Sequence, residues 1–179
     1  MKTGGGIFIS GNKETWIKGI TLSNIRINLT GGRKEKMHQQ PEDPFFAFGH
    51  HTAPVDIFCR YVKDLRLKDI NFNWDEAEHE NLGSAIRCWW VNDLDIDGFK
   101  GRQTINSDAA AISLKNVNDV FIHNSIAPVG TGSILEVDKN TTGVTIIGND
   151  FKNANYLFSK GTAGNDFFES TNRLPDSVK

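Results

Sequence analysis

The chain has 179 residues, enough for one compact domain with a sizeable core, and we expect a single domain. Its formal net charge of -2, with acidic and basic residues interspersed, gives no electrostatic basis for binding nucleic acid or an anionic membrane surface. No apolar run approaches the roughly 20 residues that span a bilayer, and the residues after Met1 lack the apolar stretch of a secretion signal. Glycine, asparagine and aspartate are frequent, as short strands and tight turns require.

One phrase recurs along the chain, and this recurrence predicts stacked structural repeats. The copies are WIKGITLSNIRI (16–27), YVKDLRLKDINF (61–72), WVNDLDIDGFKG (90–101), NVNDVFIHNSIA (116–127) and TTGVTIIGNDFK (141–152). The first apolar residues after the Gly or Asp are Ile20, Leu65, Leu94, Val120 and Val144, which lie 45, 29, 26 and 24 residues apart. We expect the polar segment at 30–53, which accounts for the long first spacing, to be a loop inserted into a regular coil.

A second apolar segment precedes each copy of the phrase, so each repeat contains at least two strands. These segments are GIFIS (6–10), VDIFCR (55–60), AIRCW (85–89), AISLK (111–115) and SILEV (133–137). Period-two alternation predicts which side chains face the core. They are Ile57, Cys59, Ile86, Cys88, Ile112 and Leu114 in the first strands, and Leu65, Leu67, Leu94, Ile96, Val120, Ile122, Val144 and Ile146 in the second.

Together, these patterns predict an all-β fold, a right-handed parallel β-helix of about five coils. We assign residues 1–160 to the β-helix and 161–179 to a C-terminal tail. A βαβ fold would need a helix between its strands, and the gaps of three or four residues exclude one. A two-sheet sandwich is the weaker alternative, because its strands would not repeat at the length of a coil.

The two cysteines, Cys59 and Cys88, occupy the same position in successive coils and should be neighbours. We favour two buried free thiols, because parallel strands in register meet disulfide geometry poorly and the sequence has neither a disulfide framework nor a zinc-binding pattern. A bridge would require an oxidising compartment.

Three carboxylates, those of Asp93, Asp95 and Asp97, alternate along one strand and should share its outer face. Adjacent ones would be about 7 Å apart, a spacing that suits an inverting glycosidase pair. The expected stacking, however, puts Arg66 beside Asp95 and Lys68 beside Asp97. We therefore interpret the row as a ladder of ion pairs between coils, since basic neighbours lower the pKa that a general acid needs raised.

A mixed aromatic and basic strip is expected on the outer face of the preceding strands. It comprises Phe58, Arg60, Arg87, Trp89, Ser113, Lys115, Glu136 and Asp138. Aromatic rings stack on sugars and basic groups pair with uronic acids, so Arg60, Arg87, Trp89 and Lys115 are the candidate polysaccharide-binding residues. An ordinary solvated sheet face is the alternative.

Catalytic and metal sites are not predicted. Gly49-His50-His51 offers two adjacent histidines without a third ligand at a suitable spacing, which favours a loop over a metal site. The sequence has no glycine-rich phosphate loop, nucleophile elbow or HExxH motif, and we expect no cofactor.

Three segments in order, GIFISGNKETWIKGITLSNIRINLTGG (6–32), PEDPFFAFG (41–49) and APVDIFCRYVKDLRLKDINF (53–72), carry a family resemblance. They resemble the C-terminal part of polygalacturonase-like glycoside hydrolases, glycoside hydrolase family 28, particularly bacterial members. The resemblance extends over residues 6 to about 100. It implies a pectin-directed, inverting hydrolase fold that is secreted or periplasmic and acts on galacturonan or a related polysaccharide.

The catalytic motifs of that family are missing from the sequence: an Asn-Thr-Asp, an Asp-Asp pair, a Gly-His-Gly and an Arg-Ile-Lys. We therefore expect a C-terminal segment of such a hydrolase without its catalytic carboxylates, and whether the chain has enzymatic activity stays open. The alternatives are a non-catalytic carbohydrate-binding or adhesin-like β-helix and a purely structural module. An uncapped β-helix end also predicts a partner chain or oligomer contact at the N-terminal coil.

Overall fold

The structure is a computed structural model, and it describes residues 6–29, 56–74, 83–104, 107–162 and 166–175. The predicted inserted loop at 30–53 and Gly49-His50-His51 lie outside the described residues. All the regular elements in the described part are strands. They are β1 (Ile7–Ser10), β2 (Ile17–Leu29), β3 (Ile57–Trp74), β4 (Ile86–Asp97), β5 (Lys100–Gly101), β6 (Ala110–His123), β7 (Thr131–Val137), β8 (Thr142–Ile147), β9 (Ala154–Phe158) and β10 (Phe167–Ser170).

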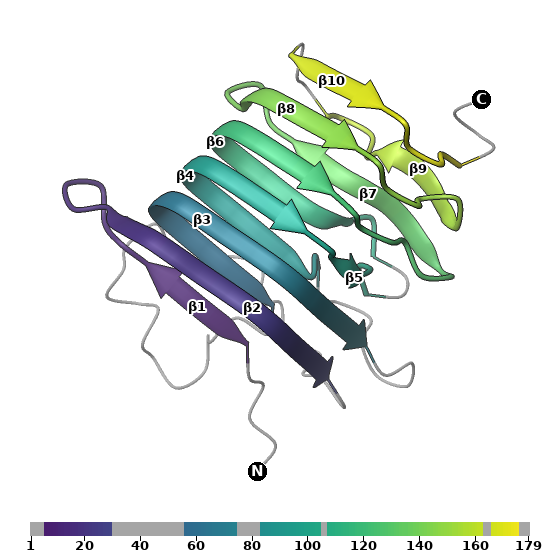
Figure 1. Cartoon of the computed structure of the whole chain (residues 1–179), viewed down its shortest axis with the longest axis horizontal. Coiled ribbons are helices and arrows are strands. Elements are labelled where there is room, and N and C mark those ends of the chain that lie inside the picture. The colour runs from purple at the N-terminus through teal and green to yellow at the C-terminus, as the bar shows by residue number, and fades with distance from the viewer. Residues whose placement is uncertain (1–5, 30–55, 75–82, 105–106, 163–165, 176–179) are drawn as a thin grey trace.

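Every strand pairing is parallel, and strands equivalent in the repeat lie side by side (Figure 1). One order of neighbours is β1-β3-β4-β6-β7-β9, and a second runs β2-β3-β4-β6-β8-β10. Ile57 pairs with Ile86 and Ile86 with Ile112, which is the predicted register. The predicted parallel β-helix is thus confirmed, and the sandwich is excluded because its neighbouring strands would be antiparallel.

β3 bends sharply twice, so it contributes to three faces of the coil, whereas β2, β4 and β6 each contribute to two. In β3, left-handed backbone occurs at Tyr61, Asp64 and Asp69, which divide the strand into residues 57–60, 65–68 and 70–74. We call the surfaces formed by these parts and their equivalents the first, second and third faces. β1, β7 and β9 belong to the first face, β8 and β10 to the second, and β5 to the third.

Positive φ angles recur at equivalent positions of successive coils and form rows along the corners. One row consists of Gly19, Asp64, Asp93, Asp119 and Gly143, and another of Asn24, Asp69, Gly98, Asn124, Gly148 and Thr171. Glycine, asparagine and aspartate tolerate the left-handed region better than other residues. The abundance of these residues in the sequence therefore has a direct cause in the corners.

The core fills the inside of the coils, where the side chains of equivalent strand positions stack on one another. All fourteen predicted inward-facing residues are at most 2% exposed, as the alternation predicts. Trp74 and Phe72 extend this core under the third face, and Trp74 Nε1 donates a hydrogen bond to the Arg102 carbonyl oxygen at 2.8 Å. At the N-terminal end, the apolar side chains of β1 and β2 are only partly buried.

Cys59 and Cys88 pair in the strand register as predicted, and both are free thiols. Burial raises the pKa of Cys59 to about 12, and the nearby Asp56 carboxylate adds to the shift. The pKa of Cys88 is also raised, mainly by burial and further by Cys59 and Asp56. Neither thiol is therefore a nucleophile at neutral pH.

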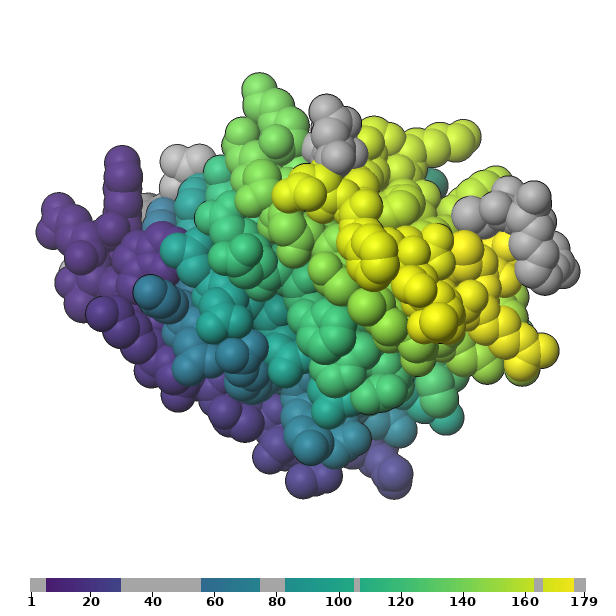
Figure 2. All heavy atoms as spheres, turned by 45° about the horizontal axis from the view of Figure 1, so that its top comes forward, coloured from purple at the N-terminus to yellow at the C-terminus, as the bar shows by residue number. Residues whose placement is uncertain are grey.

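Coil stacking continues past residue 160, into the segment that we assigned to a C-terminal tail. β10 pairs in register with β8, and a further bridge joins Asp150 to Arg173. In Figure 2 the outer surface changes colour in chain order along the molecule, as expected for coils that stack one after another. None of the described segments is a helix with the length and apolar character needed to traverse a membrane.

Candidate carbohydrate-binding surface

The aromatic and basic residues of the predicted strip gather on the first face, but they differ in accessibility. Arg60 was expected to reach solvent and instead has only 1% of its surface exposed, and its neighbour Phe58 has none. Arg60 Nε donates a hydrogen bond to Ser10 Oγ at 2.8 Å, and its guanidinium lies 5.4 Å from the centre of the Phe8 ring. The prediction that Arg60 faces an open sugar-binding strip is wrong in this respect, because its guanidinium is buried.

Arg87 is also occupied, because its guanidinium forms a two-pronged ion pair with the buried Asp56 carboxylate. Nη2 donates to Oδ1 at 2.8 Å, and Nε donates to Oδ2. The guanidinium also lies 4.6 Å from the Phe58 ring centre and 5.8 Å from the Trp89 ring. With 15% of its side chain exposed, Arg87 packs against these rings, and the Asp56 carboxylate balances its charge.

Trp89 and Lys115 are both partly exposed and lie on neighbouring coils in register. The Lys115 ammonium sits 4.9 Å from the Trp89 ring centre, and Trp89 packs edge-on against Phe58 at 4.9 Å. Lys115 has no ion pair with the carboxylates of the described residues. Trp89 Nε1 has no hydrogen-bond partner there either, although it is buried. This pair therefore combines an aromatic surface with an uncompensated positive charge.

An aromatic corner adjoins this pair, and we did not predict it as a unit. Tyr61 and Trp90 stack with ring centres 4.9 Å apart and planes 5° from parallel, and Trp16 meets Tyr61 edge-on at 5.9 Å. All three rings are partly exposed. The signal was in the sequence, because these residues open the first three copies of the repeated phrase. A row of side chains at one corner of the coil follows directly from that alignment.

The three carboxylates of β4 lie on the second face, in the ion-pair ladder that the stacking predicts. Asp95 is in register with Arg66 and Asp97 with Lys68. Arg66 contacts Asp93 Oδ1 at 3.0 Å and Asp95 Oδ2 at 4.0 Å, and Lys68 lies 3.9 Å from Asp97. Each carboxylate thus has a basic neighbour, as expected of a ladder of surface ion pairs between coils.

His123, which we did not single out, completes this row from the next coil. Its Nδ1 accepts a hydrogen bond from the Asn124 amide at 2.9 Å, and its Nε2 donates to Asp95 Oδ1 at 2.9 Å. Asp97 is in register with His123, so the alignment of the repeats already contained this contact. The described residues contain no cluster of three or more histidine, cysteine, aspartate or glutamate side chains suited to a metal ion.

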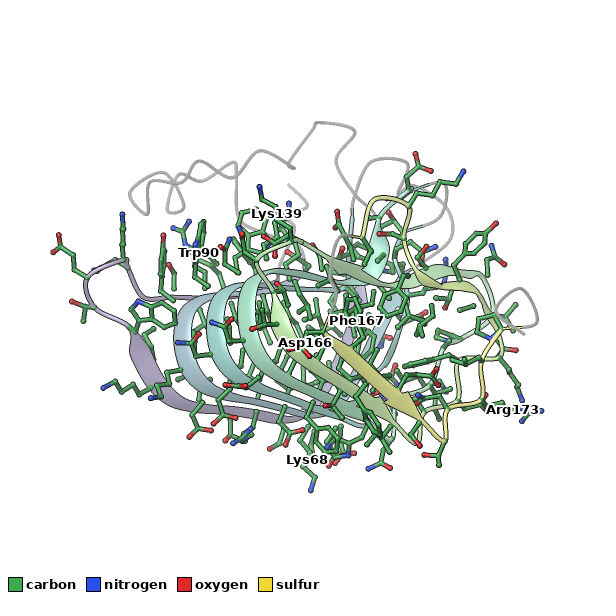
Figure 3. The ribbon with its side chains drawn as sticks, turned by 90° about the horizontal axis from the view of Figure 1, so that it is seen from above. Lys68, Trp90, Lys139, Asp166, Phe167 and Arg173 are labelled. Atoms are coloured by element: carbon green, nitrogen blue, oxygen red, sulfur yellow. The ribbon has the colours of Figure 1, made fainter. Side chains whose placement is uncertain are left out.

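The two faces differ in chemistry: the first carries aromatic rings with cations, and the second carries carboxylates, several of which pair with basic groups. Figure 3 shows Trp90 and Lys68 on different sides of the coil. Both faces offer groups that bind polar ligands.

The chain was compared with family models, curated proteins and solved structures, and none of them matches it. The strand register by itself defines the class of protein, which is a parallel β-helix.

Proposed function

We propose that the chain is a polysaccharide-binding segment of a polygalacturonase-like glycoside hydrolase, one that contributes sugar contacts without the catalytic carboxylates. The observation that carries the proposal is the pair formed by Trp89 and Lys115 on the outer side of the first face. An aromatic face packs against the apolar side of a sugar ring, and an ammonium group pairs with a uronic acid carboxylate. Polygalacturonate offers both of these features on its sugar rings, and here the two groups suited to them are neighbours.

The corner made by Trp16, Tyr61 and Trp90 supports the same proposal. Stacked aromatic rings cover several coils and offer a ligand more than one contact along the axis of the β-helix. The family resemblance of residues 6–32, 41–49 and 53–72 adds the substrate class, pectin, and a parallel β-helix is the fold which that resemblance implies.

A second candidate is a free-standing, non-catalytic carbohydrate-binding or adhesin-like β-helix. The ion pairs of Asp93, Asp95 and Asp97 favour it, because those carboxylates are engaged by Arg66, Lys68 and His123. Both candidates bind glycan at the first face, and they differ in whether the chain belongs to a hydrolase. The sequence that surrounds this segment in its gene separates them.

The direct test is the affinity of the whole chain for hexagalacturonate, measured by isothermal titration calorimetry for the wild type and single variants. We expect Trp89→Ala and Lys115→Gln each to weaken binding by about tenfold or more, as loss of an anchor residue does at other interfaces. Tyr156→Ala is the matched control, because Tyr156 is an exposed aromatic residue outside the Trp89 cluster.

Two results would overturn the proposal. One is the absence of hexagalacturonate binding in the wild type, and the other is equal affinity in Trp89→Ala, Lys115→Gln and wild type. A separate assay of reducing ends released from polygalacturonate addresses catalysis. Release at an ordinary enzymatic rate would mean that the chain holds catalytic groups, and the carboxylates of β4 would then be tested first.

A further inference from the structure

A shallow groove of about 610 Å³ lies on the second face, away from the Trp89 and Lys115 pair. It crosses the coils from β3 to β8, and its lining includes Arg66, Asp93, Asp95, Asp119, Phe121 and Thr145. Its floor is made of strand residues whose neighbours are fixed by register, so its shape is set by the β-helix itself.

An exposed aromatic ring, that of Phe121, stands in this groove with 40% of its surface exposed. Its row continues along the axis through Thr145 to Phe168, which is 58% exposed. Phe121 and Phe168 are two strand spacings apart, or about 9.6 Å, which is on the order of the length of a disaccharide unit. A sugar chain that runs along the axis would therefore meet both rings.

The Phe121 ring is held in position from one side. His123 stacks on it with ring centres 4.4 Å apart and an interplanar angle of 25°, and His123 is itself anchored to Asp95. Since His123 is not among the residues that line the groove, Phe121 presents to the groove a surface that His123 does not cover. A ring fixed in this way loses little freedom when a ligand packs against it.

The polar groups around Phe121 indicate the charge of the ligand. Asp93, Asp95 and Asp119 bring three carboxylates, and Arg66, which the first two already engage, brings one guanidinium. Carboxylates accept hydrogen bonds from sugar hydroxyls, as the hydroxyl of Thr145 also can. The excess of negative charge repels a uronic acid, so the groove suits an uncharged sugar.

We propose that this groove, together with Phe168, is a second glycan-binding surface that takes a neutral polysaccharide lying along the β-helix axis. It uses a different face and different residues from the Trp89 and Lys115 pair, so it does not depend on the proposed function. A chain with both surfaces would bind an acidic and a neutral glycan at the same time, as in a matrix where the two are mixed.

The test compares three probes on the whole chain, cellohexaose and xylohexaose as neutral glycans and hexagalacturonate as the acidic one. We expect at least one neutral hexasaccharide to bind. Phe121→Ala should lower the affinity for that hexasaccharide by about tenfold and leave the affinity for hexagalacturonate unchanged. Phe121→Trp should retain the binding. Tyr156→Ala serves as the control, and thermal unfolding of each variant checks its fold.

Phe168→Ala tests the direction of the sugar chain, because Phe168 belongs to the row without lining the groove. This variant should have a lower affinity for the hexasaccharide and an unchanged affinity for the matching disaccharide, since only the longer ligand reaches both rings. Equal hexasaccharide affinity in Phe168→Ala and wild type would refute the axial arrangement.

The inference fails if neither neutral hexasaccharide binds, or if Phe121→Ala binds it as well as the wild type does. It also fails if Phe121→Ala removes hexagalacturonate binding, because the groove would then take acidic sugars. A wild type that binds neutral glycan but not hexagalacturonate would refute the proposed function alone.

Discussion

Asn149 Nδ2 donates a hydrogen bond to Oδ1 of Asn172, the equivalent residue of the next coil, over 2.8 Å. Its Oδ1 accepts from the Ser125 backbone N–H at 2.8 Å, and its amide also reaches the carbonyl oxygen of Ile122 at 3.0 Å. Asn149 is 3% exposed. At this corner the side-chain amide of Asn149 forms hydrogen bonds with the coil before it, through Ser125 and Ile122, and with the coil after it, through Asn172.

We expect Asn149→Ala to lower the free energy of unfolding by about 2–4 kcal/mol, because buried backbone groups of Ser125 and Ile122 lose their partner. Chemical denaturation measures the loss. Asn140→Ala is the matched control, since Asn140 is exposed and makes only a 3.5 Å contact with Asp138. Equal losses in the two variants would show that the buried amide does not stabilise the corner.

The buried thiols give a pH-dependent prediction. In the folded chain the pKa of Cys59 is raised from its ordinary value of 9.0 to about 12, and that of Cys88 is also raised. Above about pH 9 the unfolded chain releases thiol protons that the folded chain keeps, so the free energy of unfolding falls as the pH rises towards about 12. Urea denaturation over this range should show the decline.

The double variant Cys59→Ala, Cys88→Ala is the control for this titration. It should be less stable than wild type at neutral pH because two buried side chains are shortened, yet its stability should decline less steeply above pH 9. An identical pH dependence in both proteins would assign the decline to other groups. At neutral pH, iodoacetamide should label neither cysteine of the folded wild type.

At Gly148 the cost of backbone strain can be measured without a steric clash of the added side chain. Its φ is +67°, and a Cβ added there would have nothing within 4 Å. Because the same corner row contains Asn24 and Asn124, Gly148→Asn should cost less stability than Gly148→Val, with a difference of about 1 kcal/mol. Thermal unfolding of both variants measures it, and equal stability would contradict left-handed backbone at this position.

The ion-pair ladder of the second face should stabilise the fold only slightly. Arg66 contacts Asp93 at 3.0 Å, but 39% of the Arg66 side chain is exposed, so Arg66→Gln should cost about 1 kcal/mol or less at low ionic strength. The cost should shrink as salt is added. Lys63→Gln is the control, because Lys63 is exposed and has no ion pair among the described residues. A cost independent of salt would point to packing of the Arg66 stem.

The repeated phrase made the fold predictable, because alternation gives the inward side of each strand and the spacing gives the register between coils. The ion pair of Lys68 with Asp97 followed from the same alignment. The contact of His123 with Asp95 could also have been predicted from the alignment, which places His123 beside Asp97 on the same outer face.

The alignment could not predict the solvent accessibility of outward-pointing side chains. This is why Arg60 was assigned to an open strip. Alternation shows that a side chain points away from the coil interior, but it does not show what lies outside it. Phe58 and Arg60 point away from the interior and are nevertheless buried. The groove at Phe121 was missed for the converse reason, since a hollow depends on side-chain lengths in four coils at once.

Among the described strands, each coil hydrogen-bonds only to the coil before it and the coil after it, as β4 does with β3 and β6. The molecule can therefore be lengthened by one unit without redesign of the others. Duplication of a single coil would move Phe121 and Phe168 along the axis by one strand spacing, about 4.8 Å, relative to residues upstream. The number of repeats therefore sets the length of each outer face, and with it the number of equivalent side chains that the face presents in a row.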